Sequence, residues 1–355
     1  AVNSEETVLA NDGMMLWGNM SGAYQQASMG YASGPPGTWD LTGTSYKSRG
    51  WNYPRLVAYM ESHDEQRLMY KDLEYGNSSG SYNIKNLKTA LNRIKLCEAF
   101  FYPIPGPKML WQFGELGYDY SIDYPSNTDA DRTSPKPIKW DYYSNPNRLA
   151  LYKTTAALIK LKINYPAFRS TDFSVNLAGA VKTINITDKS MDVAIIGNFD
   201  VVQRSANLNF QNTGKWYNYF SGDSINVTNT QTQFTLKPGE FHIYTTKKLP
   251  TPEKGIITNV NSTNTAQISS YKLMQNYPNP FNPTTVIEYQ IPKSGFVSLK
   301  VFDILGREVA TLVNENEQAG THTVTFNGSK LSSGIYFYKL KSDAFSDVRK
   351  FVMMK

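Results

Sequence analysis

Four side chains that can bind ligands or transfer protons stand close together in the segment YMESHDEQRLMY. Glu61, His63, Asp64 and Glu65 lie within five residues of one another, directly after the apolar run LVAYM. Such a run predicts a buried strand, so the polar residues occupy the loop at its carboxyl end. An imidazole N–H beside a carboxylate can hold two neighbouring hydroxyls of a sugar ring. Such hydrogen bonds are worth several kcal/mol when they strengthen as the ring approaches an oxocarbenium ion.

Two other interpretations of this segment stay open. The loop can be a solvated turn, which is the usual fate of charged residues after a strand. Alternatively, Glu61, His63 and Glu65 can converge on a cation from alternate positions, but no second His or Cys cluster accompanies them. We therefore assign no metal site.

The surrounding sequence alternates between strand and helix patterns. RLVAYM (55–60) and KMLWQF (108–113) predict buried strands, and apolar spacing predicts helices over 83–101 and from about 147 to 163. The stretch Glu5–Met20 also has the apolar spacing of a helix start. Strands followed by loops and helices are typical of a parallel sheet or barrel, whose carboxyl-end loops carry the polar working residues.

After Phe168 the sequence changes to short strands separated by Gly, Asn and Pro turns. Residues 169–247 predict an all-β domain, a small antiparallel sandwich. Residues 248–271 are rich in Thr, Asn and Ser and poor in large apolar residues, which predicts a linker. Residues 272–355 alternate clearly and predict a second small β-sandwich.

Charge and cysteine content narrow the class of protein. The net charge of +6 comes from scattered Lys and Arg without a basic block, so no nucleic-acid partner is predicted. The single Cys97 lies in a helical pattern and is expected to be buried and inert. No apolar run reaches the ~18 residues of a transmembrane segment. The start AVNSEETVLA has neither an initiator Met nor a signal-peptide apolar region, so we expect a C-terminal fragment of a longer protein.

YMESHDEQR, followed by a helix and then GPKMLWQFGELGYD, resembles the last two strand–loop units of the α-amylase family of glycoside hydrolases. KPIKWDY and the helix NRLALYKTTAALIKLKINYPAFR are similar to the family's segment between barrel and β-domain. The resemblance implies that residues 1–168 are the C-terminal portion of a (β/α)8 catalytic barrel. The expected fold class is therefore multidomain, with this barrel portion followed by an antiparallel β-sandwich and a second small β-sandwich.

The resemblance also implies roles for residues at the strand ends. His63 would hydrogen-bond the substrate at the cleavage subsite, and Asp64 would be the carboxylate that binds and distorts that sugar. Glu61, Glu65 and Arg67 match no position of the family's pattern, so we expect them to be solvated or to support the loop.

Three residues near the next strand end are candidates for the substrate cleft. Trp111, Glu115 and Tyr118 follow the predicted strand KMLWQF. For Trp111, packing in the core is the alternative interpretation.

The family's retaining mechanism needs an Asp nucleophile and a Glu acid/base, both on earlier barrel strands. The opening AVNSEETVLANDGMMLWGNM resembles the segment after the strand that carries the acid, so neither residue is expected in this chain. Glu5, Glu6 and Asp12 are not assigned to these roles. The resemblance thus implies a starch-type α-glucan hydrolase whose fragment is inactive alone. Calcium is frequent in the family, but we identify no cofactor and no ligand set for it here.

The sequence from NYPNPFNPTT through GTHTVTFNGSKLSSGIYFYKL to the basic tail resembles the type IX secretion sorting domain. Each proline restrains the backbone before it, which fixes an extended, turn-rich entry to the sandwich. The motif residues are Asn276, Tyr277, Pro278, Asn279, Pro280, Phe281, Asn282 and Pro283. The resemblance implies recognition by the outer-membrane secretion machinery and a secreted or cell-surface location. A carbohydrate-binding or adhesive β-sandwich is the alternative.

Three functions follow for the whole protein. The first is a secreted hydrolase whose partner is an α-glucan polysaccharide. The second is a branching or transglycosylating enzyme of the same family. The third is a non-catalytic, surface-displayed glycan-binding protein.

Overall fold

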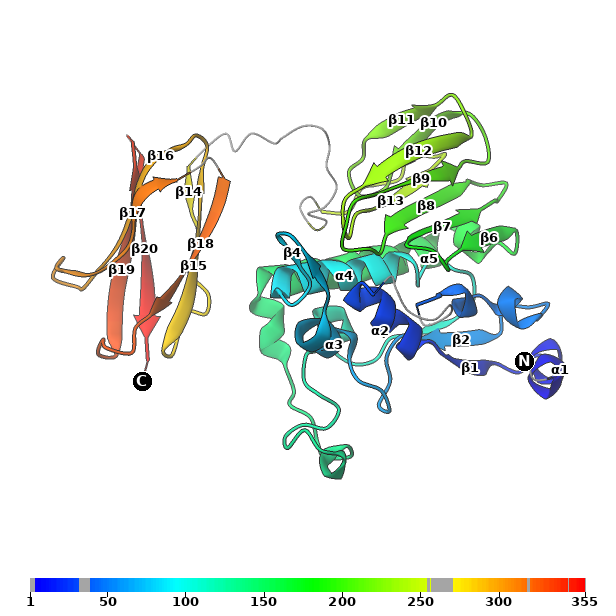
Figure 1. The fold of residues 1–355 in the computed structure, drawn as a ribbon, viewed down its shortest axis with the longest axis horizontal. Helices are drawn as coiled ribbons and strands as arrows, with labels where there is room; N and C mark the ends of the chain where they lie inside the picture. The colour runs from blue at the N-terminus through cyan, green and yellow to red at the C-terminus, as the bar shows by residue number, and fades with distance from the viewer. Residues whose placement is uncertain are drawn as a thin grey trace. The chain divides into compact units, whose positions relative to one another are not determined.

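The computed structural model describes residues 4–31, 39–253, 256, 271–317, 320–343 and 345–354. The chain divides into two compact units, Ala1–Asn261 and Ser262–Lys355, which we call the N-terminal and C-terminal units (Figure 1). The predicted linker, residues 248–271, falls largely outside the described residues. No helix in the described part of the chain is long and apolar enough to cross a membrane.

The N-terminal unit begins with a parallel sheet of three strands. Its order is β1 (Leu16–Asn19), β2 (Leu56–Tyr59), β5 (Lys108–Met109), and all neighbours are parallel. The helices of this part are α1 (Ser4–Asn11), α2 (Ser21–Met29), α3 (Leu68–Tyr75), α4 (Leu87–Ala99) and α5 (Pro146–Asn164). The strand–helix alternation predicted from the sequence is present, and the loops that follow β1, β2 and β5 leave the same end of the sheet.

Local sequence explains where the two long helices begin. The side chain of Asn86 accepts hydrogen bonds from the N–H groups of Lys88 and Thr89 at 3.0 and 3.4 Å, which caps α4. Asn145 caps α5 in the same way, and Pro146 occupies its first turn, where no N–H is needed. Both helices lie close to the predicted ranges.

Two predicted elements of this part are shorter than expected. A helix does start in the stretch Glu5–Met20, but α1 ends at Asn11, and Leu16–Asn19 pairs with β2 as a strand. Gly13 has φ +107°, a backbone conformation that a helix cannot continue through. The predicted strand 108–113 is shorter than expected, since pairing stops at Met109 and Phe113 adopts φ 60°. Leu16–Asn19 is a strand because it pairs with β2, which lies far along the chain, and the local spacing of apolar residues does not reveal this pairing.

An antiparallel part completes the N-terminal unit. Six strands form one sheet in the order β11-β10-β13-β8-β7-β6, and β9 pairs with β12 (Figure 1). The strands are β6 (Phe173–Asn176), β7 (Val181–Ile186), β8 (Val193–Asn198), β9 (Arg204–Asn209), β10 (Gly214–Asn218), β11 (Ser224–Val227), β12 (Gln231–Leu236) and β13 (Phe241–Thr245). Strand β8 is buried throughout, because its two faces pack into two different apolar clusters.

Helix α4 and strand β8 share one core. Leu96 and Phe100 belong to the same apolar cluster as Ile195 and Phe199. The contact is close at Gly197, where a Cβ would lie 2.5 Å from the ring of Phe100. The helical and antiparallel parts are therefore packed as a single body.

Short elements connect these parts. A hairpin pairs β3 (Ser78–Ser79) with β4 (Tyr82–Asn83). The 3₁₀ turns are Thr42–Thr44, Tyr46–Arg49, Gly114–Leu116, Asp129–Asp131, Trp140–Ser144 and Pro166–Arg169.

The C-terminal unit consists of two antiparallel sheets around one core. One sheet has the order β14 (Lys272–Leu273), β15 (Thr284–Ile291), β18 (Gly320–Asn327). The other has the order β17 (Glu308–Glu317), β16 (Gly295–Phe302), β19 (Gly334–Ser342), β20 (Phe345–Met353). Ile287 and Tyr289 from the first sheet join Leu299, Tyr338 and Phe351 from the second in the same apolar cluster. This arrangement is a β-sandwich.

Candidate functional site

The loop after β2 presents one pair of polar side chains to solvent. His63 and Asp64 have 70% and 67% of their side chains exposed, and His63 Nε2 lies 3.3 Å from Asp64 Oδ2. The preceding Glu61 and Ser62 are buried. The pair is thus free to meet a ligand, while the start of its loop is anchored in the protein.

Buried charges hold this loop in shape. Glu61 Oε1 accepts a hydrogen bond of 2.6 Å from the N–H of Leu68 at the start of α3, and Arg67 Nη1 donates to the carbonyl of Ser62 at 3.0 Å. Burial raises the pKa of Glu61, although Arg67 and the Leu68 N–H act in the opposite direction. Burial likewise lowers the pKa of Arg67, opposed by Glu61. Both groups support the loop from inside.

Glu65 ties the loop to the neighbouring strand. Its Oε1 accepts a hydrogen bond of 2.5 Å from Asn19 Nδ2 at the end of β1. Its Oε2 accepts from the hydroxyl of Ser62. The carboxyl ends of β1 and β2 are therefore linked through one carboxylate.

Aromatic rings form a wall beside the exposed pair. The ring centroid of Trp111, just after β5, lies 5.6 Å from that of His63. The guanidinium carbon of Arg67 lies 5.7 Å from the Trp111 ring and 5.6 Å from the Tyr118 ring. The Tyr118 hydroxyl donates to the carbonyl of Pro137 at 2.7 Å, and burial raises its pKa to about 12. Tyr118 therefore keeps its proton at neutral pH.

A loop from the end of the sheet is fastened over the segment 62–67. Gln66 of this segment makes most of the hydrogen bonds to the loop. Its Nε2 donates to Ser121 Oγ at 2.9 Å and to Asp123 Oδ2 at 3.1 Å. Gln66 Oε1 accepts from the N–H of Ile122 at 2.9 Å. Farther along, the guanidinium of Arg132 donates to the carbonyl of Asp64. These bonds make the loop a second wall of the site.

The two loops enclose a pocket of about 390 Å³. Its volume lies within the range of roughly 300–1,000 Å³ that is common for small-molecule sites. It is lined by His63, Asp64, Arg67, Trp111, Gln112, Tyr118, Tyr120, Ser121, Ile122, Arg132, Thr133, Ser134 and Lys136. Among these lining residues, Asp64 is the one carboxylate, and three side chains are cationic. The pocket combines aromatic surface with hydrogen-bonding groups at its mouth.

The structure brings together most of the residues predicted from the sequence. His63, Asp64, Trp111 and Tyr118 all line the pocket, whereas Glu115 does not. The Glu115 carboxyl is turned into the protein, where burial raises its pKa and its Oε2 has no hydrogen-bond partner among the described residues.

Several lining residues were not predicted. Arg132 and Lys136 reach the pocket from a loop far from the His–Asp pair in sequence, and no pattern marks them. Arg67 had a signal, since it belongs to the same segment as His63, but its buried position over Trp111 depends on tertiary packing.

No metal centre is apparent at this site. In the described ranges, no group of three or more His, Cys, Asp or Glu side chains could hold a metal ion. The alternative grouping of Glu61, His63 and Glu65 is divided, because Glu61 is buried beneath the loop while His63 points to solvent.

The motif NYPNPFNP lies in the C-terminal unit and is mostly fastened to the core. The side chain of Asn276 is buried, and its Nδ2 donates to the carbonyl of Pro278 at 3.0 Å and to Thr285 Oγ1 at 2.9 Å. Phe281 is buried as well, and its N–H donates to the carbonyl of Val352 at 3.0 Å. The motif joins the entry of the sandwich to its last strand.

Comparison with known families assigns this unit. Residues 275–354 match the family described as secretion system C-terminal sorting domain. The C-terminal unit is therefore a type IX sorting domain, and it directs the protein to secretion and cell-surface attachment. No curated protein matches the chain.

Solved structures resemble a large part of this chain. AmyP in complex with maltose has a TM-score of 0.51 at 16% identity, over 71% of this chain and 55% of that chain. An α-amylase from Geobacillus thermoleovorans in complex with acarbose has a TM-score of 0.47 at 14% identity, over 63% and 46%. The cyclomaltodextrin glucanotransferase CldA has a TM-score of 0.48 at 14% identity, over 65% and 44%.

The first of these likenesses shows that a large part of this chain has the fold of part of AmyP. The chain spans about half the length of the solved structures that it matches.

Proposed function

We propose that the N-terminal unit binds α-glucans and is the C-terminal part of a retaining α-amylase-type glycoside hydrolase. The observation that carries this proposal is the exposed His63–Asp64 pair at the carboxyl end of β2, beside Trp111 in a pocket of about 390 Å³. The fold shared with AmyP, which was solved in complex with maltose, supports the same ligand class.

The proposed roles follow from the chemistry of each group. The Asp64 carboxylate accepts hydrogen bonds from neighbouring hydroxyls of one sugar, and such charge-assisted bonds are stronger than neutral ones. The His63 imidazole donates to the same ring. When positive charge develops on the ring, the fixed carboxylate stabilises it electrostatically. Trp111 offers apolar surface to a face of the sugar, while the buried Tyr118 ring packs against Arg67.

A retaining hydrolysis needs two further carboxyl groups about 5–5.5 Å apart. Asp64 is the one carboxylate among the pocket's lining residues. We propose that the nucleophile and the acid/base lie outside this chain, so the 355-residue chain binds glucan without cleaving it. The single carboxylate also favours a second candidate, a non-catalytic glycan-binding protein.

In this proposal the chain has four parts. Residues 1–168 are the barrel portion, residues 169–247 the domain that follows it, residues 248–271 a linker and residues 272–355 the sorting domain. Secretion to the cell surface brings the first two parts to where polysaccharides are met.

Calorimetric titration of the chain with maltotriose tests the binding site. Asp64→Asn is expected to weaken binding about tenfold or more, because a hydrogen bond to a charged group contributes roughly 1.5–3 kcal/mol. Asp172→Asn is the matched control, an exposed aspartate outside the pocket, and should leave the affinity unchanged. Equal affinity of the wild type and Asp64→Asn for maltotriose would contradict the proposed binding site.

Reducing-sugar release from soluble starch tests the proposal that the nucleophile and the acid/base lie outside this chain. The 355-residue chain is expected to stay at background, and hydrolysis by it would contradict the proposed absence of both carboxyl groups. The same assay on the product of the complete reading frame separates the two candidate functions. Only an enzyme would release reducing sugar, and His63→Ala should abolish that release.

A further inference from the structure

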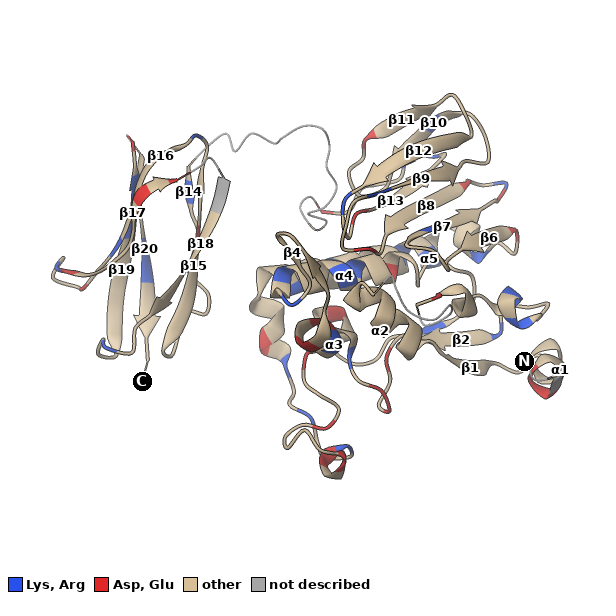
Figure 2. Ribbon diagram, viewed as in Figure 1, with Lys and Arg blue, Asp and Glu red and all other residues tan. Residues whose placement is uncertain are grey.

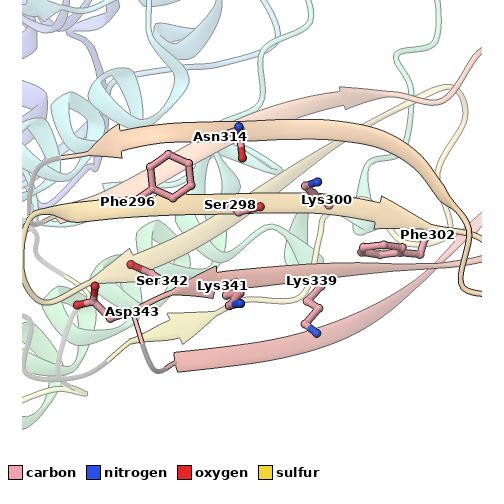
Figure 3. A pocket seen from close by; sticks show the side chains of 9 residues that line it. All are labelled: Phe296, Ser298, Lys300, Phe302, Asn314, Lys339, Lys341, Ser342 and Asp343. Atoms are coloured by element: carbon pink, nitrogen blue, oxygen red, sulfur yellow. The ribbon is translucent and has the colours of Figure 1, made fainter.

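The outer face of the four-stranded sheet in the C-terminal unit carries a groove of about 580 Å³. Its lining residues come from β17, β16, β19 and the turn after β19, as Figure 3 shows. They are Phe296, Ser298, Lys300, Phe302, Asn314, Lys339, Lys341, Ser342 and Asp343. We call this feature the lysine groove.

Strand alternation places the lysines on the solvent side. Val297, Leu299 and Val301 of β16 are buried in the core, so the intervening residues of that strand point outward. In the antiparallel register Lys300 lies directly opposite Lys339 on β19. Ser298 lies opposite Lys341 in the same register.

This arrangement has an electrostatic cost within the domain itself. Like charges directly opposite each other on neighbouring strands destabilise a sheet. Glu308 relieves only part of the repulsion, with its Oε2 2.9 Å from Lys300 Nζ. In the described part of the unit, no carboxylate lies within ion-pair distance of Lys339 or Lys341.

The acid at the end of the groove is already engaged. Asp343 Oδ2 lies 2.9 Å from Lys293 Nζ and accepts a hydrogen bond of 3.0 Å from the Tyr271 hydroxyl. The groove therefore keeps a net positive lining, which an anionic ligand would neutralise.

The spacing of the groups matches an extended chain. Lys339 and Lys341 are two residues apart on one strand, which separates them by roughly 6.6 Å along it. An extended polypeptide with acids at alternate positions presents its carboxylates at the same interval. Phe296, half exposed at 51%, and Phe302 flank the row at its two ends and offer apolar contact.

We propose that the lysine groove binds an extended acidic segment of a partner protein, with carboxylates at alternate positions facing Lys339 and Lys341. A bilayer surface fits less well, because the cations line a groove along the sheet face rather than a projecting surface. The inference goes beyond the sorting assignment, since it names a surface and the chemistry of what binds there. It does not depend on the proposed glucan site.

Fluorescence anisotropy with the full chain tests the groove. The probe is a short fluorescein-labelled peptide of alternating threonine and glutamate, and the matched peptide has glutamine in place of glutamate. We expect the acidic peptide to bind, with an affinity that falls as salt rises, and the double variant Lys339→Gln/Lys341→Gln to bind about tenfold more weakly. Lys330→Gln, a lysine of the same unit outside the groove, should bind like the wild type.

Each other result would overturn the proposal. Equal binding of the glutamine peptide would show that the groove does not recognise the carboxylates. An equal loss of peptide affinity in Lys330→Gln would show that only the net charge of the unit matters. Binding to phosphatidylglycerol vesicles without binding to the peptide would replace the protein partner by a membrane surface. Maltotriose binding should be unchanged in all these variants, so failure here is separable from failure of the glucan proposal.

Discussion

The two units of this protein place their charged side chains in opposite ways. The N-terminal unit buries acids and bases in its interior, whereas the buried polar residues described in the C-terminal unit are the neutral Asn276, Thr285 and Ser342. The buried charged residues of the N-terminal unit are Glu61, Arg67, Asp72, Arg93, Lys95, Glu98, Arg148, Lys182, Asp200 and Glu240. Figure 2 shows where the charges of both units lie along the ribbon.

Buried charges in the N-terminal unit fasten backbone that regular structure leaves unpaired. Arg93 is fully buried, with Nε donating to the carbonyl of Ser28 at 2.8 Å and Nη2 to that of Phe199 at 2.7 Å. Arg148 donates to the carbonyl of Leu116 at 2.9 Å, below the pocket's aromatic wall. Such groups are costly to bury and are tolerated only when hydrogen-bonded. They hold irregular loops in place, which is what a binding site made of loops requires.

The C-terminal unit needs no such internal charges, because two alternating sheets satisfy their own backbone. Its cations are left on the outer surface, where a partner can reach them. The same residue types thus serve as internal supports in one unit and lie on the outer surface of the other.

The two recognisable motifs follow the same division. His63 and Asp64 are exposed and make few contacts within the protein, while Asn276 and Phe281 are buried. Substitutions at the first pair should change ligand binding, and substitutions at the second should change stability.

The largest effect should appear in the pH dependence of the N-terminal unit. Burial raises the pKa of Asp72 to about 8, opposed by the Ser28 hydroxyl and by Arg93. The folded state therefore binds this proton more tightly than the unfolded state, and stability is lost as pH rises from about 4 to about 8. Because each pKa unit corresponds to about 1.4 kcal/mol, the loss is on the order of 6 kcal/mol.

Urea unfolding followed by tryptophan fluorescence measures this loss, because all six tryptophans lie in the N-terminal unit. Asp72→Asn should flatten the pH dependence, and the exposed control Asp172→Asn should keep it. An unchanged slope in Asp72→Asn would show that this carboxyl is not the group that titrates.

A second large effect is expected in the core of the sorting domain. Phe281→Ala removes a buried ring that contacts Phe326 and Phe351, at a cost of about 3–5 kcal/mol. Hydrogen exchange of the β15 and β20 amides reports this unit separately from the tryptophan signal. Phe296→Ala, on the exposed outer face, is the matched control and should change protection little. Similar losses in both variants would remove the distinction between buried motif and open surface.

A moderate effect is expected at the pocket wall. Trp111→Ala should weaken maltotriose binding by about 1–2 kcal/mol through lost apolar contact, with little change in unfolding of the C-terminal unit. Trp140→Ala, an exposed tryptophan outside the pocket, should bind normally in the same titration. Loss of binding in both would point to disturbed folding.

The smallest effect concerns the cross-strand lysine pair. Replacing Lys339 by threonine removes the like-charge contact with Lys300 and should stabilise the C-terminal unit by about 0.2–1 kcal/mol. The gain should shrink at high salt, because the repulsion is screened. Destabilisation by this change would mean that the two ammonium groups do not repel each other measurably.

Much of this fold could be predicted from local sequence. Helices α4 and α5 have sustained apolar spacing and asparagine caps, and strands β15, β16 and β19 alternate over eight or nine residues. Strand β1 could not be predicted, because four residues carry no period and only pairing with β2 makes them a strand.

The candidate site was predictable where its residues are adjacent in sequence. The His63–Asp64 pair stood out because it follows an apolar run. Arg132 could not be found in this way, since it reaches the carbonyl of Asp64 through a loop anchored by Gln66. Glu115 follows β5 as expected, but the turn that begins at Phe113 aims it inward rather than into the pocket.

A titration of the tryptophan indole N–H signals with maltotriose, observed by NMR, tests the proposed glucan site most directly. Trp111→Phe assigns the relevant signal. We expect the Trp111 signal to move saturably while that of Trp216, buried in the antiparallel part, stays in place. Asp64→Asn should weaken the response. A Trp111 signal that does not move at saturating maltotriose, or that moves equally in Asp64→Asn, would rule out glucan binding at this site.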